Sequence, residues 1–343
     1  MHKPLVSRSL PESPVTLVLG AGVSMESGIP SWPALVGRVF REIRGEEPPA
    51  WVSEPWAHPA PHPLALQIAF EALEDELERK ERRARKAAPA TGRSAFAKLL
   101  ADAMYADVKG PKGSTLSALV ETLARDQARP ERHVTRVITF NADDLLERAA
   151  NAKGRSKSAP VLWPISRESA HIRRERGFGG RPPIPVYHVH GFLPGEPRSY
   201  PDAPDCLVFT DEQYWATVAS PSSFPNRVLL EALHDSHCVF VGLSMTDVNL
   251  ARWLGVRRHL FVADKERQWN GEDPEKRRRS LDRALRRHTF VRTASAPGTA
   301  RAADEAFVSR WLAARGVETQ EMRGWGAPFR ELLGPLPWGP DSP

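Results

Sequence analysis

Residues 15–30 read VTLVLGAGVSMESGIP, and this stretch decides the class of fold. The apolar, β-branched run predicts a buried strand, and Gly-Ala-Gly predicts a sharp turn after it. Gly20 and Gly22 lack a Cβ, so the backbone can turn tightly and present amide N–H groups to a phosphate at the start of a helix. The stretch is typical of a nucleotide site, although a purely steric strand-to-helix turn uses the same glycines.

The spacing of the glycines argues against a hydride-transfer enzyme. A dehydrogenase fingerprint places a third glycine three residues after the second, where this chain has Met25, and the next glycine is Gly28. No second strand ending in an acidic residue follows about 20 residues later. A dinucleotide-binding dehydrogenase is therefore disfavoured.

Composition sets the broad class of the protein. The chain has 343 residues, 41% of them hydrophobic, which is enough for one large core. Its two cysteines, Cys206 and Cys238, are too few for a disulfide framework or a four-cysteine zinc site. With no signal-peptide pattern and no long apolar run, we expect a soluble cytoplasmic protein with no metal and no membrane contact.

The charge balance is mildly basic, with 48 basic and 42 acidic residues and a net charge of +6. This excess permits contact with nucleic acid without requiring it. A basic cluster at 276–287 is an unbalanced surface that a partner or a phosphate backbone would suit, although a solvated face is favoured.

Apolar runs separated by helical patterns predict a mostly parallel sheet wrapped by helices, an α/β Rossmann-like architecture. Residues 34–131 contain no convincing strand and are predicted to be a large helical insertion, centred on a helix near 64–88 whose acids precede bases at i,i+4 spacing. The predicted strands are Thr16–Leu19, Val134–Phe140, Pro185–His190, Cys206–Phe209, Cys238–Val241, Leu260–Val262 and Gly316–Met322.

Two strands are followed by polar residues at the edge where open α/β sheets bind ligands. Residues 137–146 read VITFNADDLL, which places Asn141, Asp143 and Asp144 after the strand end. Asn141 or Asp143 is expected to cap the helix that begins at Asp144. Residues 186–191 read VYHVHG. His188 and His190 share one strand face, and we favour His190 as a base because it stands at the strand end before a glycine.

A third strand leads into residues 239–249, VFVGLSMTDVN. Gly242 and Ser244 are small enough for a ribose or adenine to approach the backbone, and Thr246 or Asp247 is expected to cap the following helix. A plain strand-to-helix turn stays an alternative for this segment.

Together, GAGVSMESGIP, TFNADDLLE, HVHG and VGLSMTD resemble in order and spacing the sirtuins, and more closely the sirtuin-like domains of bacterial defence proteins. The resemblance implies one sirtuin-like domain over residues 1–343 that binds NAD⁺ as a substrate. By motif, the residues carried over are Asn141, Asp143 and His190 for catalysis, and Gly20, Ala21, Gly22, Ser24, Gly242, Ser244 and Asp247 for NAD⁺ binding.

Two departures from the sirtuin deacylases change the expected reaction. This chain lacks their four-cysteine zinc module, and Ser31-Trp32-Pro33 replaces their acidic-Phe-Arg segment after Gly-Ile-Pro. We therefore expect water as the acceptor and an NAD⁺ glycohydrolase that serves anti-phage defence, held silent as a homo-oligomer or by a regulatory partner protein. The alternatives are a protein deacylase or ADP-ribosyl transferase, and a non-catalytic module that senses NAD⁺ or ADP-ribose.

Overall fold

The structure is a computed structural model, and it describes residues 14–48, 64–83, 95–152, 159–166, 182–200, 207–245, 247–268, 288–296 and 298–325, with a few single positions between 273 and 285 and at 329. Every statement below refers to these residues. Thr246, Cys206 and most of the basic cluster at 276–287 lie outside them.

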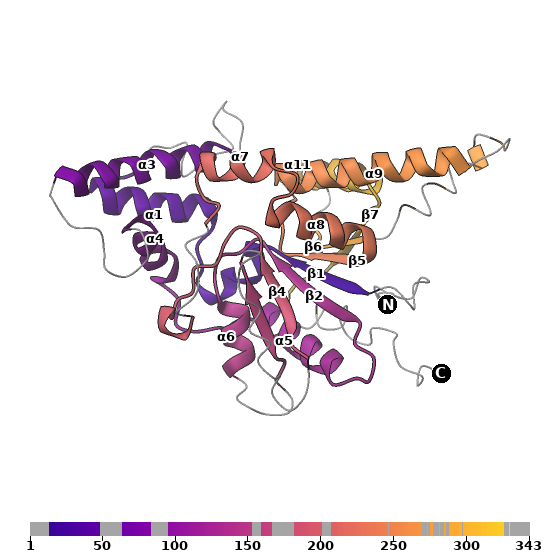
Figure 1. Ribbon diagram of the computed structural model, residues 1–343, viewed down its shortest axis with the longest axis horizontal. Coiled ribbons are helices and arrows are strands. Elements are labelled where there is room, and N and C mark those ends of the chain that lie inside the picture. The colour runs from indigo at the N-terminus through magenta and orange to yellow at the C-terminus, as the bar shows by residue number, and fades with distance from the viewer. Residues whose placement is uncertain are drawn as a thin grey trace.

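A sheet of seven strands forms the centre of the described part of the chain, and every neighbouring pair of strands is parallel (Figure 1). The strand order is β3-β4-β2-β1-β5-β6-β7. This confirms the predicted Rossmann-like α/β fold. The strands are β1 (Val15–Leu19), β2 (Val134–Thr139), β3 (Leu162–Ile165), β4 (Ile184–His188), β5 (His237–Val241), β6 (His288–Thr293) and β7 (Val317–Met322).

The central strand β1 marks the point where the strand order reverses. From β1 the chain runs to β2 and β4 on one side, and it later returns to place β5 on the other side of β1. In open parallel sheets the loops separate at such a point, and ligands bind outside the carboxyl ends of the strands there. The loops after β1, β2, β4 and β5 therefore border the place where a ligand is expected to bind.

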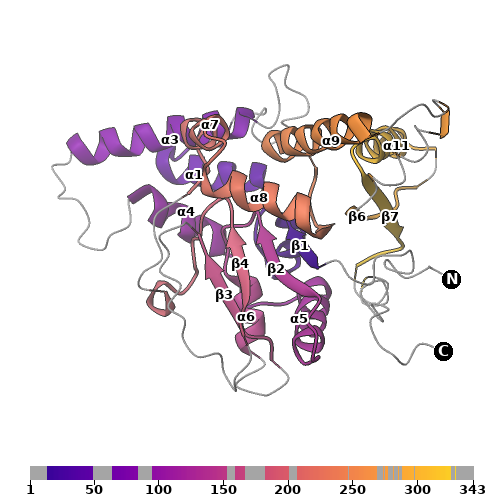
Figure 2. The same cartoon turned by 45° about the vertical axis from the view of Figure 1, so that its right-hand side comes forward.

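Helices cover both faces of the sheet. In Figures 1 and 2, α3, α7 and α9 follow one another along one side of the molecule, while α5 and α6 lie beside β2 and β4. The α-helices are α1 (Trp32–Arg44), α3 (Leu64–Arg83), α4 (Ala95–Tyr105), α5 (Ser114–Gln127), α6 (Leu145–Ala152), α7 (Asp211–Ala219), α8 (Phe224–Asp235), α9 (Val248–Gln268) and α11 (Ala300–Ala313).

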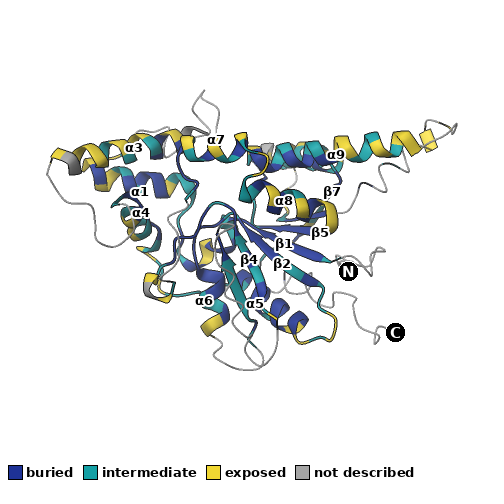
Figure 3. Cartoon of the chain, viewed as in Figure 1, coloured by how far each residue is buried: buried dark blue, intermediate teal, exposed yellow. Residues whose placement is uncertain are grey.

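The alternation of side chains along β1 divides the core into two layers. Leu17 and Leu19 pack into a cluster shared with α1, α3, α4, α5 and α6, whereas Val18 packs with α8, α9 and α11 on the opposite face. All five β1 residues are buried, as Figure 3 shows for the centre of the sheet. A strand covered on both faces is a nearly continuous apolar run, as the VTLVL sequence of β1 is.

The polar turn expected between β1 and the next helix consists of two 3-10 turns, Ala21–Val23 and Met25–Ser27, which precede α1. Two expected strands were wrong, because Leu260–Val262 lies inside α9 and residues 207–209 form no strand. Short apolar runs fit a helix as well as a strand, and periodicity alone cannot separate the two. Strands β3 and β6 were missed.

The segment predicted to be a helical insertion contains α3, α4, α5 and all of α1 except its first two residues, with no strand among its described residues. Within α3, Glu76 and Lys80 form one of the expected i,i+4 ion pairs, at 3.5 Å. The last helix, α5, packs against α6 and β2. The boundaries 34–131, and the assignment of residues 1–343 to one domain, stay predictions.

Candidate functional site

The predicted site residues lie on loops that leave adjacent strands at the same level. Thr139 of β2 pairs with His188 of β4, and Asn141 and His190 each stand two residues beyond that pair. On the other side, Leu19 of β1 pairs with both Thr139 and Val241. The carboxyl ends of β1, β2, β4 and β5 therefore bring together the four segments that carry the predicted residues.

Asn141 is buried and its amide nitrogen is fully used by the protein. Nδ2 donates to the Gly20 carbonyl at 3.0 Å and to Ser24 Oγ at 3.2 Å. An asparagine amide has two N–H donors and one carbonyl acceptor. Since both donors are directed at the loop after β1, Oδ1 is the atom with which Asn141 can accept a hydrogen bond from a ligand or a water.

Ser24 connects this amide to a buried carboxyl group. Its hydroxyl donates to Asp143 Oδ1 at 3.1 Å, and the Leu145 N–H donates to the same oxygen at 3.0 Å. Burial raises the pKa of Asp143 to about 6, although these two hydrogen bonds act to lower it. Asp143 thus stabilises the start of α6, as its capping role predicted, and also belongs to the network that orients Asn141.

The glycines of the site allow the loops after β1 and β5 to contact each other directly. The N–H groups of Gly20 and Gly22 donate to the carbonyls of Val241 and Gly242, at 3.0 and 2.9 Å. A Cβ on Gly22 would lie 2.9 Å from the Gly242 Cα, and Gly242 itself has a φ of +68°. These amides are already used within the protein, and the small residues let the loops after β1 and β5 touch.

His190 is nearly buried beside aromatic rings and one carboxylate. Its ring stands edge-on to Phe140, with centroids 4.9 Å apart, and its Nε2 lies 3.6 Å from Asp247 Oδ2. Burial lowers the pKa of His190 below its usual value, while the charge of Asp247 opposes that effect. A histidine that is mostly neutral near pH 7 can accept a proton, which suits the predicted base.

Asp247 caps α9, and it is one of the two residues, Thr246 and Asp247, that were expected to do so. Its Oδ1 accepts the Leu250 N–H at 2.7 Å, and its backbone carbonyl accepts the Ala251 N–H at 3.0 Å. Before it, Met245 adopts a φ of +59°, a left-handed conformation rare for a residue with a side chain. Ser244, in the same loop, is exposed.

His188 differs sharply from His190. It is buried, and its two ring nitrogens lie 2.9 Å from the Asn141 carbonyl and 3.0 Å from Glu147 Oε1. Burial lowers the pKa of His188, but the neighbouring charge and hydrogen bond of Glu147 outweigh burial and raise it. His188 is therefore a structural support beneath Asn141, and the preference for His190 as the residue at the strand end is consistent with this placement.

Sequence reasoning missed the acidic and aromatic groups around α6. Tyr105 donates a hydrogen bond to Asp144 Oδ1 at 2.9 Å, and the Asp144 N–H donates to the Tyr105 hydroxyl at 3.0 Å. Glu147, the partner of His188, comes from the first turn of the same helix. Only the adjacent acids Asp143 and Asp144 hinted at this cluster, because Tyr105 is distant in sequence. Among the described residues, no group of three or more His, Cys, Asp and Glu side chains is arranged to hold a metal ion.

A family model described as "SIR2-like domain" matches residues 135–287. The matched segment runs from β2 through α9 and contains Asn141, Asp143, His190, Gly242 and Asp247, whereas Gly20–Ser24 precede it. No curated protein matches the chain significantly. The family match supports a sirtuin-like domain, a class of domain that in general uses NAD, and an NAD-related activity is compatible with it.

Within the part of the chain that the structure describes, no helix combines the length and apolar character needed to cross a membrane.

Proposed function

We propose that this protein is an NAD⁺ glycohydrolase that cleaves NAD⁺ to nicotinamide and ADP-ribose. The observation that carries the proposal is the equivalent placement of Asn141 and His190, each two residues beyond the paired residues Thr139 and His188 on adjacent strands. The family match over both residues adds that the domain class uses NAD.

The reaction needs an electron sink, a nucleophile and a base. The bond between C1′ of the ribose and the nicotinamide nitrogen breaks, and its electron pair neutralises the pyridinium ring. Water adds to the oxocarbenium-like C1′, and one proton is released to a base and then to solvent. Because nicotinamide is already a good leaving group, the protein mainly has to orient the ribose and the water.

The side chains at the strand ends fit these tasks. With its N–H groups bound to Gly20 and Ser24, Asn141 would use Oδ1 to accept a hydrogen bond from the attacking water or from the nicotinamide ribose. Asp143 keeps Ser24 in place and thereby fixes the amide. His190, with its lowered pKa, would accept the proton.

The direct test is release of nicotinamide from NAD⁺ by the purified protein. We expect turnover by the wild type and a loss of at least about 100-fold in kcat for Asn141→Ala and for His190→Ala, because each removes a polar group from the reacting centre. The matched controls are Asn151→Ala at the exposed end of α6 and His259→Ala on the exposed side of α9, which should keep wild-type rates.

Two outcomes would replace the proposal. Tight NAD⁺ binding without cleavage, and unaffected by His190→Ala, would define a sensing module. Product that forms only with an acylated or acceptor protein would define a deacylase or an ADP-ribosyl transferase.

We further propose that the chain acts as an effector of bacterial anti-phage defence by depleting NAD⁺, with a homo-oligomer or a partner protein controlling its activity. The resemblance to sirtuin-like domains of bacterial defence proteins supports this role. Expression in bacteria infected with phage should lower cellular NAD⁺, and expression of His190→Ala should leave it unchanged.

A further inference from the structure

Asp247 is held between two helices beside His190. Its Oδ1 accepts the Leu250 N–H at 2.7 Å, which fixes the carboxylate to the first turn of α9. Its Oδ2 accepts the hydroxyl of Tyr214, from α7, at 3.3 Å. The same Oδ2 lies 3.6 Å from His190 Nε2. Each oxygen of this carboxylate thus has a fixed donor, and one oxygen also faces the imidazole.

Tyr214 is itself held by hydrogen bonds, so its position affects that of Asp247 and that of His190. Its hydroxyl accepts the Asn249 N–H at 2.9 Å while it donates to Asp247. Its ring stands edge-on to His190, with centroids 6.3 Å apart. The side chain is buried. A single tyrosine of α7 therefore contacts the capping segment of α9 and the ring of the candidate base.

The surroundings of His190 make Asp247 the dominant charge near it. The ring edge of Phe140 covers one side and the ring of Tyr214 another. Among the described residues, Asp247 is the charged group that acts on the protonation of His190, opposing the effect of burial. A carboxylate beside one ring nitrogen of histidine favours a proton on that nitrogen.

We propose that Asp247 and Tyr214 are positioning residues that hold His190 with Nε2 toward the carboxylate, so that Nδ1 is the nitrogen that takes the proton during hydrolysis of NAD⁺. This inference rests on the proposed function. It gives Asp247 a role in orienting the base in place of the NAD⁺ contact predicted for it. The separation of 3.6 Å is longer than a hydrogen bond, and such contacts commonly tighten when substrate binds.

Steady-state kinetics of Asp247→Asn and Tyr214→Phe test the proposal. Asparagine can still cap α9, so the first variant removes the charge and keeps the helix start. We expect kcat to fall at least about tenfold in Asp247→Asn and about threefold in Tyr214→Phe, with KM for NAD⁺ within about twofold of wild type. Tyr187→Phe, which removes a tyrosine hydroxyl from β4 near Phe224, is the control and should keep both constants.

The pH dependence of kcat/KM distinguishes a role in catalysis from a structural defect, because a structural defect alone would not shift it. Loss of the Asp247 charge removes an interaction that raises the pKa of His190. The acidic limb of kcat/KM should therefore shift to lower pH in Asp247→Asn. A raised KM with unchanged kcat would show instead that Asp247 binds NAD⁺, and unchanged kinetics would show that it has no role.

Titration of the His190 ring by NMR separates this inference from the proposed function, because it needs no turnover. A lower pKa of His190 in Asp247→Asn than in wild type supports the pairing, and equal values overturn it. If the wild type fails to cleave NAD⁺, the proposed function fails while the NMR titration still decides whether Asp247 controls His190.

Discussion

At the scale of single residues, Gly242 combines two demands that only glycine meets. Its φ is +68°, and a Cβ would lie 2.8 Å from the Val23 backbone nitrogen in the loop after β1. Gly45, which ends α1, has a similar φ of +72° but nothing within 4 Å of an added Cβ. Substitutions at Gly45 and Gly242 therefore separate the free-energy cost of a left-handed backbone from the free-energy cost of a steric clash.

We predict that Gly45→Ala lowers the free energy of unfolding by about 1 kcal/mol, through the left-handed backbone alone. Gly242→Ala should cost about 3 kcal/mol or more, because the backbone of the β1 loop must also move. Urea unfolding of both variants measures the difference. Equal losses would show that the contact between the two loops carries no energy.

The buried Asp143 should make the free energy of unfolding depend on pH. Burial raises its pKa from 3.8 to about 6, so the folded state binds more protons than the unfolded state between these values. Its unfavourable contribution is absent below about pH 4 and complete above about pH 6. Asp143→Asn keeps an oxygen that can accept from Ser24 and Leu145.

We therefore predict that Asp143→Asn gains stability relative to wild type as pH rises from 4.5 to 8, by about 2 kcal/mol. Thermal unfolding of both proteins across this range is the measurement. A difference in Tm that does not change with pH would contradict the raised pKa.

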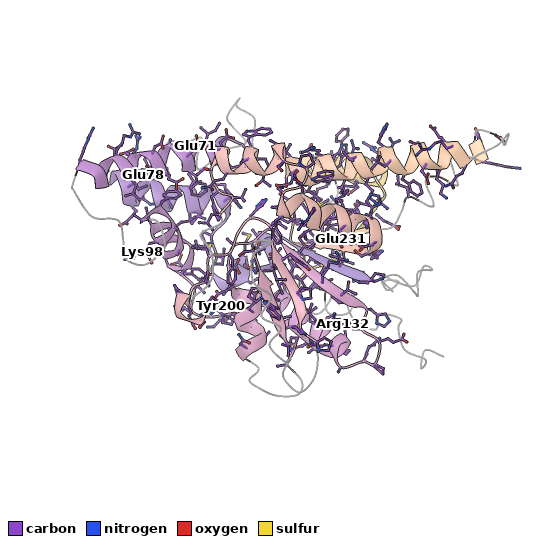
Figure 4. The ribbon with its side chains drawn as sticks, viewed as in Figure 1. Glu71, Glu78, Lys98, Arg132, Tyr200 and Glu231 are labelled. Atoms are coloured by element: carbon purple, nitrogen blue, oxygen red, sulfur yellow. The ribbon has the colours of Figure 1, made fainter. Side chains whose placement is uncertain are left out.

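At the scale of elements, α7 connects the helices of the predicted insertion to the site. Trp32 of α1 stacks on Phe209, which precedes α7, with centroids 5.2 Å apart. Glu71 of α3 accepts the N–H of Glu212 in the first turn of α7 at 2.9 Å, and Figure 4 shows Glu71 where the two helices meet. Because α7 also carries Tyr214, a change in these contacts can reach Asp247.

We predict that Trp32→Ala destabilises the protein by about 3 kcal/mol, as expected for loss of a large packed aromatic residue. Amide exchange in α7 should become faster, and kcat should fall, as is expected for Tyr214→Phe. Hydrogen exchange measured by mass spectrometry tests the first effect. Unchanged exchange in α7 would mean that the stack does not hold that helix.

At the scale of the whole molecule, the candidate site depends on loops from both sides of β1. A ligand at the strand ends would contact loops after β2 and β4 on one side and after β5 on the other. Binding to the folded state alone stabilises a protein by mass action, by about 2.7 kcal/mol at a ligand concentration 100 times Kd.

We predict that NAD⁺ raises the Tm of His190→Ala, a variant expected to bind NAD⁺ without consuming it. Calorimetry at increasing NAD⁺ concentrations measures the shift, and nicotinamide alone serves as the control. No shift at millimolar NAD⁺ would contradict a site at these strand ends.

The sequence was sufficient for the fold where a signal was local. A strand buried on both faces is a nearly continuous apolar run, so β1 and β5 could be predicted directly. In β2, Thr135 and Arg136 are only partly buried, and the apolar residues on either side of them carry the prediction. Strand β3 was missed because it is short, partly exposed and contains Pro164. Leu260–Val262 was misread because an apolar triplet does not reveal its period.

For the site, the sequence predicted which loops gather at the strand ends but not how their side chains pair. The pairing of Asn141 with Ser24, and of Asp247 with Tyr214, joins residues separated by 117 and 33 positions. Such contacts depend on tertiary packing, which neither periodicity nor motif spacing encodes. Whether these residues bind NAD⁺ stays a prediction.

The position of β1 also has a consequence for biosynthesis. β1 leaves the ribosome before either of its neighbours, and β2 and β5 begin at residues 134 and 237. A newly made β1 must therefore wait for more than a hundred further residues before one edge is paired, and for over two hundred before the other is. During that interval an apolar strand with open edges is a natural client for chaperones that bind nascent chains.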